Sequence, residues 1–439
     1  MINVRLEAYK IILKVLSKQI FSDKLLSVMR KKIQDAGEDS QLLYVLVKGI
    51  IKMRKNLEFI ASCHTESSKW QNTNIKFKIL IYIGLYQLIH CDGIPEHAAV
   101  NETVNLAKKL YGEKIGNFVN AVLRSYLRNS KIEYPVNPQD RFALQYSFPE
   151  DLIADWIERW GAEKTESLCQ YFNAVPRLHI RVNSMATNRN KLIEYFARRN
   201  IIVEGSPASQ NMLLSDQARE ILSDVAFTEG YYSIQDTSAA LVVELMKPQM
   251  QESVLDLFAA PGGKATYTAE LMANTGEVIA IDKSPNKIKK IKQASERLKL
   301  VNLREQAIDA FNFGPVAPAY DKVLLDVPCS GWGVFQKKAE LRWQENQEIP
   351  KLLKLQESAL KLGASFTNVG GFLIYSTCTM NEPENEGQVE KFLAKNRNFK
   401  LIPANSVIGN NFTANGYLKT LPFEHNMDGA FAAKMQRMK

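Results

Sequence analysis

Hydrophobic residues recur at helical spacing through the first 130 positions. Runs such as LLYVLVKGIIKM and KFKILIYIGLYQLIH are typical of buried helices, and Gly and Pro are sparse around them. CDGIPEH is a turn signal, and AVNETVNLAKKLYG then predicts a new helix with Gly112 near its end. NFVNAVLRSYLRNS predicts a closing, basic amphipathic helix. We therefore expect an all-α domain over residues 1–130.

The pattern changes at KIEYPVNPQD, where Pro135 and Pro138 mark a boundary. DLIADWIERWG predicts a helix that ends at Gly161, and NRNKLIEYFARRN predicts another. Between them, PRLHIRVN alternates as a strand does. Residues 131–235 are expected to form a small α+β module.

From residue 236 onward, strand-like and helical runs alternate. The expected strands are ESVLDLF, GEVIAID, LREQAID, YDKVLLDVP and GGFLIYST. Helical patterns lie between them, for example PNKIKKIKQASERLKL. Such alternation predicts a parallel, doubly wound sheet, so residues 236–439 should form an α/β, Rossmann-like domain.

The net charge of +9 is confined to the first domain. Residues 1–130 hold 20 Lys and Arg against 11 Asp and Glu, whereas the remaining residues hold 36 of each sign. A basic module ahead of a neutral body fits a polyanionic partner such as RNA, although a merely solvated basic surface fits equally well. The same two interpretations hold for Arg124, Arg128 and Lys131.

The cysteine and histidine patterns argue against structural metal or disulfide chemistry. Five cysteines make an odd count without a CxxC pair, and the five histidines show no ligand spacing. Free thiols fit the reducing cytosol. The N-terminus lacks a signal-peptide core, and no apolar run is long enough to cross a membrane. We expect a cytoplasmic monomer without metal, in which Cys63, Cys91 and Cys169 are inert.

Acidic residues follow several of the expected strands. Asp256 opens DLFAAPGGKATY, where Gly262 and Gly263 let backbone approach a ligand and the next helix offers free N–H groups to a carboxylate. Other strand ends carry Asp282, Asp309 and Asp326. Taken singly, each could be a cap or a solvated strand end. Ligands of doubly wound sheets bind where such ends meet, so together they indicate a ligand site.

Three strings resemble one known family. AAPGGK, DVPCSGWG and YSTCTMNEPENE look like the RNA 5-methylcytosine methyltransferases of the Nop2/Sun/RsmB type. RFALQYSFPEDL and RLHIRVN resemble the RNA-recognition module of that family, and HNMDGAFAAKMQR resembles its closing strand. IYIGLYQLIHCDGIPEHAAVNETVNLAKK, GNFVNAVLR and LRSYLRN resemble the NusB-like helical domain of its bacterial rRNA members. The resemblance covers nearly the whole chain.

The resemblance implies three domains and a cofactor. They are a NusB-like RNA-binding domain at 1–130, an RNA-recognition module at 131–235 and a class I methyltransferase domain at 236–439. S-adenosylmethionine is the implied cofactor, with Asp282 at its ribose, Asp309 on its adenine side and Asp326 also in contact. The motif segment implied to bind it consists of Phe258, Ala259, Ala260, Pro261, Gly262, Gly263 and Lys264.

The implied reaction is methylation of carbon 5 of a cytosine in RNA, with 16S rRNA the favoured substrate. Carbon 5 is a poor nucleophile, and a thiolate that adds to carbon 6 activates it. By resemblance Cys378 is that nucleophile, preferred over Cys329, which assists breakdown of the adduct. Asp326 is the candidate for holding the N3/N4 edge of the base. Lys264 is expected to favour the thiolate because it brings a positive charge nearby.

Three alternatives remain. A tRNA substrate changes only the target, and the NusB-like domain favours rRNA. A non-catalytic RNA-binding ribosome assembly factor would have lost a cysteine, yet Cys329 and Cys378 are both present. A small-molecule methyltransferase would need neither the basic module nor paired cysteines.

The chain departs from the family pattern at Phe258, Trp332 and residues 336–339. These departures leave the expected cofactor site complete, but they do not indicate which RNA is the target or how it is contacted. Lys337, Lys338 and Arg342 are candidates for phosphate contacts. Trp332 either packs or stacks on RNA, whereas Trp70 and Trp343 are expected to pack.

Overall fold

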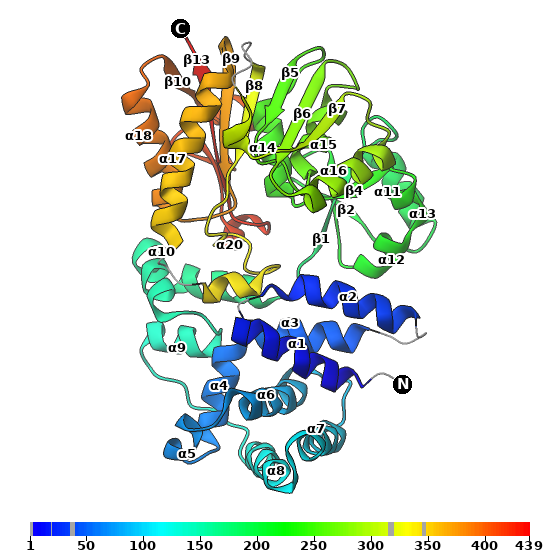
Figure 1. Cartoon of the computed structure of the whole chain (residues 1–439), viewed down its shortest axis with the longest axis vertical. Coiled ribbons are helices and arrows are strands. Elements are labelled where there is room, and N and C mark those ends of the chain that lie inside the picture. Colours follow the sequence, from blue (N-terminus) through cyan, green and yellow to red (C-terminus); the bar gives the residue numbers. More distant parts are fainter. Residues whose placement is uncertain (1–2, 19, 36–39, 315–319, 345–347) are drawn as a thin grey trace. The chain divides into compact units, whose positions relative to one another are not determined.

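The structure is a computed structural model, and it describes residues 3–18, 20–35, 40–314, 320–344 and 348–439. The chain divides into two compact units (Figure 1). One comprises Met1–Asn173 with Lys338–Trp343, and the other Ala174–Lys337 with Gln344–Lys439. The expected domain boundaries near residues 130 and 235 remain predictions.

The first unit is helical, as the hydrophobic pattern predicts. Helix α6 (Ile75–His90) is buried on most faces. It starts after a capping residue, Asn74, whose side chain accepts from the Lys76 N–H. Helix α7 (Glu96–Tyr111) ends at Gly112, whose φ of 82° lies in the left-handed region. The helices are α1 (Val4–Lys18), α2 (Ser22–Asp35), α3 (Gln41–Lys52), α4 (Arg54–Cys63), α5 (Ser67–Gln71), α6 (Ile75–His90), α7 (Glu96–Tyr111) and α8 (Glu113–Arg128).

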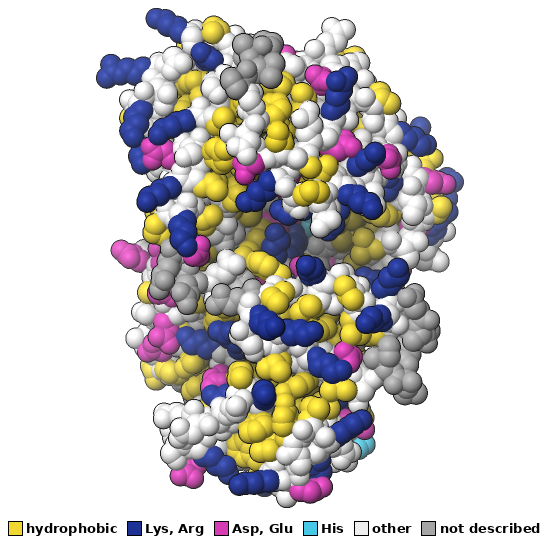
Figure 2. All heavy atoms as spheres, in the orientation of Figure 1, with side chains coloured by type: hydrophobic (Ala, Val, Ile, Leu, Met, Phe, Trp, Pro, Cys, Tyr) yellow, Lys and Arg dark blue, Asp and Glu magenta, His cyan; other side chains and the backbone are white. Residues whose placement is uncertain are grey.

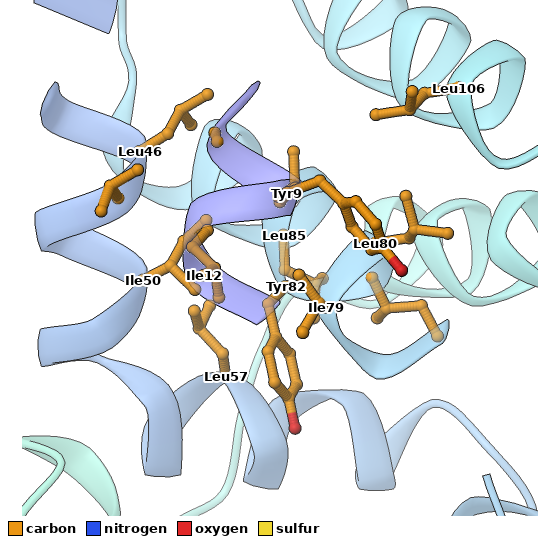
Figure 3. Close-up of a cluster of buried hydrophobic side chains, with 14 of the residues drawn as sticks. Tyr9, Ile12, Leu46, Ile50, Leu57, Ile79, Leu80, Tyr82, Leu85 and Leu106 are labelled. Atoms are coloured by element: carbon orange, nitrogen blue, oxygen red, sulfur yellow. The ribbon is translucent and has the colours of Figure 1, made fainter. Parts of the chain in front are cut away.

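The core of these helices is a single cluster of aliphatic side chains with a few tyrosines (Figure 3). Ile12 of α1, Ile50 of α3 and Leu57 of α4 meet the α6 side chains there, among them Leu80 and Leu85. Burying a side chain of this size contributes about 1.5–3 kcal/mol. This burial explains how the almost unbroken apolar surface of α6 is kept away from water.

Two further helices complete the first unit, α9 (Pro138–Gln145) and α10 (Glu150–Asn173). Gly161 has φ of 78° and interrupts α10, at the position where the sequence predicts a helix end. The predicted helix end is therefore correct. A second helical segment continues to Asn173 and contains Cys169, because a glycine break stops one helix without preventing another from starting.

The short segment Lys338–Trp343 belongs to this helical unit. Arg342 is fully buried, donates to the Asn173 side chain (2.9 Å) and to the Phe172 carbonyl (3.0 Å), and stacks on Phe148. Trp343 donates to the Ile51 carbonyl at 3.1 Å. The expectation that Arg342 contacts phosphate is therefore wrong, because its guanidinium is enclosed by protein.

The second unit contains a small antiparallel sheet in the order β2-β3-β1-β4. The sequence predicts only β1, since the other strands are short. The strands are β1 (Leu178–Val182), β2 (Glu204–Gly205), β3 (Met212–Ser215) and β4 (Tyr232–Ile234). The helices of this part are α11 (Arg189–Ala197), α12 (Ala218–Ser223) and α13 (Val225–Thr228). Ile180, Phe196 and Tyr232 share its hydrophobic core.

A larger sheet follows in the order β11-β12-β13-β9-β8-β5-β6-β7. The five strands that the sequence predicts are all present and mutually parallel. They are β5 (Ser253–Asp256), β6 (Glu277–Asp282), β7 (Leu303–Ala307), β8 (Tyr320–Asp326) and β9 (Thr367–Thr377). The strand order reverses on either side of β5, and the crevice beside such a reversal is where ligands bind in sheets of this type.

Helices cover both faces of this sheet, because alternate strand residues point to opposite sides. Val254 and Leu324 pack in one core with residues of the first three helices, and Leu255 and Leu325 pack in a second core with the last two. The helices are α14 (Thr237–Met246), α15 (Gly263–Leu271), α16 (Pro285–Leu298), α17 (Ile349–Phe366) and α18 (Glu386–Lys395).

The prediction of a purely parallel sheet is wrong at one edge. β13 (Ala430–Arg437) runs antiparallel to β9, and it pairs in turn with two further strands, β10 (Phe399–Ile402) and β12 (Tyr417–Thr420). β11 (Thr413–Ala414) completes the edge. Strand-like hydrophobicity does not encode direction, so the doubly wound part was recognised and its antiparallel extension was not.

Charged side chains are mixed on the surface. Figure 2 shows Lys and Arg side chains scattered over the visible face, with Asp and Glu side chains between them. Arg124, Arg128 and Lys131 are all exposed, which fits both a solvated face and an RNA-facing one. Within the described ranges, no helix combines the length and hydropathy that a membrane span requires.

Candidate active site

The acidic residues singled out in the sequence lie at one edge of the large sheet. Asp256, Asp282 and Asp326 end β5, β6 and β8, and Asp309 follows β7 by two residues. Since these strands are parallel, their carboxyl ends face the same way. The sheet therefore brings the four carboxylates to one edge, as the strand pattern predicts.

The loop from β5 to α15 is shaped for close approach by a ligand. Gly262 has φ of 104°, and a Cβ there would lie 2.9 Å from the Ile291 side chain, so glycine is required. α15 begins at Gly263, and the N–H groups of its first turn have no acceptors within the helix. Their partial positive charge fits a carboxylate.

Asp256 lies beneath this loop and is almost completely buried. Among the described residues, neither of its oxygens accepts a hydrogen bond of ordinary geometry, although the Phe258 N–H is near enough to affect its charge. Burial and then the negative charge of Asp326 raise the pKa of Asp256 to about 8, against the opposing effect of Lys264. The carboxyl group is therefore mostly neutral at pH 7.

Asp282 and Asp309 both fix the turns that follow their strands. Asp282 accepts from the Ser284 N–H at 2.9 Å, and Asp309 accepts from the Phe311 N–H at 3.0 Å. The rings of Phe258 and Phe311 meet edge to face at 6.3 Å. Two rings from the loops after β5 and β7, at a sheet edge whose strand ends carry carboxylates, fit a ligand that has hydroxyl groups and a flat ring.

Lys264 connects the loop to the end of β8. Its Nζ atom lies 2.7 Å from Oδ2 of Asp326, and the Ser376 hydroxyl donates to the other oxygen at 2.8 Å. Burial alone would lower the pKa of Lys264. The acidic groups around it, Asp326 foremost and then Cys378 and Asp256, raise that pKa overall. Lys264 is therefore a fixed cation at this edge.

Two cysteines come together here from separate strands. Cys329 follows β8, Cys378 follows β9, and their Sγ atoms lie 3.4 Å apart. That separation is a hydrogen bond between two thiols and far exceeds a disulfide bond length. The hydrogen bond to Cys378, followed by burial, raises the pKa of Cys329 well above its ordinary value. Cys329 is therefore a protonated thiol that can donate to the sulfur of Cys378.

A buried carboxylate that the sequence analysis did not select organises both cysteine loops. One oxygen of Glu384 accepts from the Ser330 N–H and from the Gln356 amide, both at 2.9 Å. Its other oxygen accepts from Asn381 at 2.9 Å. Glu384 lies within the quoted string YSTCTMNEPENE, so its place in that motif was the only signal. The sequence alone does not indicate the role of Glu384, because Ser330 and Asn381 come together only in the fold.

The loop after Cys329 packs backbone against backbone on the Cys378 loop. The Gly333 N–H donates to the Cys378 carbonyl at 3.0 Å, and the Gly429 N–H donates to the Gly333 carbonyl at 2.9 Å. A Cβ on Gly333 would lie 2.0 Å from the Gly429 oxygen and 2.8 Å from the Cys378 oxygen. Only glycine fits at position 333, between these two backbone segments.

The basic stretch after Cys329 does not present the charges that the sequence suggests. Lys337 binds the carboxylates of Asp236 and Asp428, the latter at 2.8 Å. Its charge is thus neutralised within the protein, and the expectation of a phosphate contact at Lys337 is not supported. Lys338 is exposed and Trp332 is half-buried. Across the described ranges, no three His, Cys, Asp or Glu side chains gather in a way that would hold a metal ion.

Three family descriptions match the chain. "16S rRNA methyltransferase RsmB/F" matches residues 243–436, and "NusB family" matches residues 2–128. "Methyltr_RsmF/B-like, ferredoxin-like domain" matches residues 148–221. The matches follow the order of domains that the resemblance implies.

Curated relatives and solved structures agree with these matches. Proteins called "Probable ribosomal RNA small subunit methyltransferase B" are 33% identical in Synechocystis sp. (all of both chains) and 32% identical in Bacillus subtilis (99% of both). The crystal structure of PH0851 has a TM-score of 0.81 at 24% identity, covering 99% of this chain and 98% of that one. NSun6 from Pyrococcus horikoshii, solved with SFG, has a TM-score of 0.59 at 22% identity, covering 67% and 99%.

The structural likenesses fall below 25% identity and establish the fold alone: a helical domain, a small α+β domain and a Rossmann-like methyltransferase domain. The sequence relative that spans the entire chain at 33% identity establishes more. Together with the three ordered family matches, it confirms the resemblance seen in the motifs: the chain belongs to the 16S rRNA methyltransferase RsmB/F family.

Proposed function

We propose that this chain transfers a methyl group from S-adenosylmethionine to carbon 5 of a cytosine in 16S rRNA, with Cys378 as the covalent nucleophile. The observation that carries the proposal is the pair of thiols 3.4 Å apart beside the Lys264–Asp326 ion pair. Methylation of an inert ring carbon needs a thiolate, a proton donor and a polar group for the base edge, and this cluster supplies all three.

The residues around the loop fit the cofactor. The helix start at Gly263 suits its carboxylate, Asp282 suits the ribose hydroxyls, and Asp309 with the Phe258 and Phe311 rings suits the adenine side. When bound, the cofactor supplies an electrophilic methyl group. The remaining motif residues between Ala259 and Lys264 form the turn that lets the backbone approach it.

The chemistry on the base follows from the two cysteines. The sulfur of Cys378 bonds to carbon 6, and the electron pair of the 5,6 double bond becomes available at carbon 5 for the methyl group. The proton on carbon 5 then leaves to solvent, its electron pair restores the double bond, and the sulfur–carbon bond breaks. The S–H of Cys329 returns a proton to the departing sulfur, because its raised pKa keeps it protonated.

Lys264 and Asp326 act on either side of this addition. Asp326 accepts from the amino group of the base edge, while Lys264 pairs with that carboxylate and places a positive charge near Cys378. A nearby cation favours a thiolate. Since the target base must reach a half-buried sulfur, it has to leave its stack.

The substrate is tested by sequencing. Bisulfite sequencing of rRNA and tRNA from a strain lacking this gene should show one 5-methylcytosine lost from 16S rRNA and restored by the wild-type gene. Loss at a tRNA position instead would replace rRNA with tRNA as the substrate. If every 5-methylcytosine persisted, the chain would be an RNA-binding assembly factor without catalytic activity. The names of the curated relatives support the rRNA assignment.

A further inference from the structure

A buried amide nitrogen faces the start of α15. Gln235 lies between β4 and α14 and is 8% exposed. Among the described residues, nothing accepts a hydrogen bond from its Nε2 atom. A Cβ placed on Gly263 would lie 3.4 Å from this nitrogen, so Nε2 is directed at the first residue of the helix.

Arg181 fixes the orientation of that amide. Its Nη1 group donates to Oε1 of Gln235 and, at 2.7 Å, to the Gly263 carbonyl. A guanidinium has only donors, so the amide atom that meets it must be the oxygen. The nitrogen of Gln235 is thereby turned away from Arg181.

Arg181 itself is held rigidly. It is fully buried on β1, and its guanidinium makes a two-point contact with the Glu270 carboxylate, at 2.7 and 3.2 Å. The Thr266 hydroxyl accepts a further bond at 3.1 Å. Four of its hydrogen bonds go to three residues of α15, so Arg181 ties the small sheet to the helix that follows the glycine loop.

The Gln235 nitrogen, unpaired among the described residues, lies beside Gly263, where the first-turn N–H groups of α15 have no acceptors within the helix. A buried donor without an acceptor is costly, and a helix N-terminus favours negative charge. One carboxylate would satisfy both. We infer that Gln235 binds the methionyl carboxylate of S-adenosylmethionine through Nε2, and that Arg181 is the positioning residue for this contact. This inference rests on the cofactor of the proposed function.

The burial of the site favours the cofactor over RNA as the source of the anion. A backbone phosphate belongs to a bulky polymer, whereas the side chain of Gln235 is more than nine-tenths enclosed. Cofactor analogues with and without the carboxylate separate the two sources.

The test compares two ligands that differ only in the carboxylate. Calorimetric titration of wild type and Gln235→Met uses S-adenosylmethionine and decarboxylated S-adenosylmethionine. For Gln235→Met we expect about tenfold to hundredfold weaker binding of the first, as for one lost hydrogen bond to a charged group. Binding of the decarboxylated ligand should change less than about twofold. Equal weakening of both ligands, or of neither, would overturn the assignment.

Arg181 is tested without leaving a buried charge unpaired. The double variant Arg181→Met/Glu270→Met removes both members of the ion pair and keeps Gln235. It should show the same selective loss, because the amide is no longer oriented. Full retention of the preference for the carboxylate ligand would remove Arg181 from the proposal.

A matched control separates folding effects from ligand contacts. Gln87→Met replaces another buried glutamine, which lies in the helical unit and bonds only to protein atoms there. It should lower the melting temperature without changing the affinity ratio of the two ligands. If wild type bound neither ligand, the proposed function would fail. If wild type bound S-adenosylmethionine and Gln235→Met kept the ratio, only this inference would fail.

Discussion

The Sγ atoms of Cys329 and Cys378 lie 3.4 Å apart, on loops that follow the neighbouring parallel strands β8 and β9. The contact joins two residues separated by 49 positions in the chain. Either sulfur could donate in this contact by geometry, but the raised pKa of Cys329 favours its thiol as the donor, which makes the pair asymmetric. This asymmetry makes the two cysteines experimentally distinguishable.

The roles of the cysteines predict opposite results for two matched variants. Cys329→Ser should still add to the RNA base but release it slowly, so a covalent protein–RNA complex accumulates. Cys378→Ser should form no complex and should lose methyl transfer. Denaturing gel electrophoresis with labelled RNA measures both. A complex that formed with Cys378→Ser and not with Cys329→Ser would make Cys329 the nucleophile.

The positive charge of Lys264 should affect how adduct formation depends on pH. In a Cys329→Ser background, the added change Lys264→Met should shift the rise of the trapping rate to higher pH by about one unit, because a nearby cation favours the thiolate. Lys290→Met serves as the control, since that lysine is exposed on α16. An unchanged rate and pH profile would remove Lys264 from thiol activation.

Asp256 should make the protein less stable as pH rises. Its pKa is raised to about 8 in the folded state, against about 3.9 for an unfolded chain. Between these values the folded state holds the extra proton, so the free energy of unfolding falls with pH, by at most about 1.4 kcal/mol per unit. Above pH 8 both states are ionised and this slope ends.

The change Asp256→Asn keeps the shape and removes this titration. Urea unfolding from pH 5.5 to 8 should show a shallower loss of stability for the variant than for wild type, and higher stability of the variant at pH 8. Parallel profiles for the two proteins would show that Asp256 is ionised in the folded state and would contradict the prediction.

Gly333 should tolerate no side chain. In Gly333→Ala the new methyl group meets two backbone oxygens, those of Gly429 and Cys378, and backbone moves less readily than a side chain. Overpacking of this kind costs about 1–3 kcal/mol, and the shift reaches the nucleophile directly. We expect a lower melting temperature and at least about tenfold slower methyl transfer, which is the effect of about 1.4 kcal/mol.

Gly314→Ala is the control for this substitution. Among the residues that the structure describes, a Cβ on Gly314 meets nothing within 4 Å, so both the melting temperature and the rate of methyl transfer should match those of wild type. A Gly333→Ala protein with normal turnover would mean that the two cysteine loops can move apart without loss of function.

The sequence predicted the parts of the fold that depend on periodicity. Buried helices such as α6 and the five parallel strands repeat their hydrophobic pattern over enough residues to be read locally. The antiparallel strands β10 to β12 were not predicted, because their direction depends on pairing with β13 and with one another. Gly161 shows a related limit, since a break in one helix does not indicate whether another helix starts after it.

The candidate site was predictable as far as its residues carry recognisable chemistry. Cysteines and aspartates at strand ends stand out in a sequence, and the sheet brings them to one edge. The partners of the charged residues do not stand out. Lys337 and Arg342 looked like a basic stretch, but buried acceptors more than 90 residues away in the chain neutralise or enclose them. Glu384 was overlooked for the same reason.

The segment Lys338–Trp343 determines how this protein can be divided. The chain leaves the sheet-containing unit after Lys337, places Arg342 and Trp343 among the helices, and returns at Gln344. A single cut after Asn173 would leave the N-terminal fragment with a hole where these side chains belong. The C-terminal fragment would expose Arg342, which is buried among the helices, and Trp343, which donates to the Ile51 carbonyl there. A chimera that takes the helical unit from a relative therefore has to exchange two segments, the N-terminal helices and this hexapeptide.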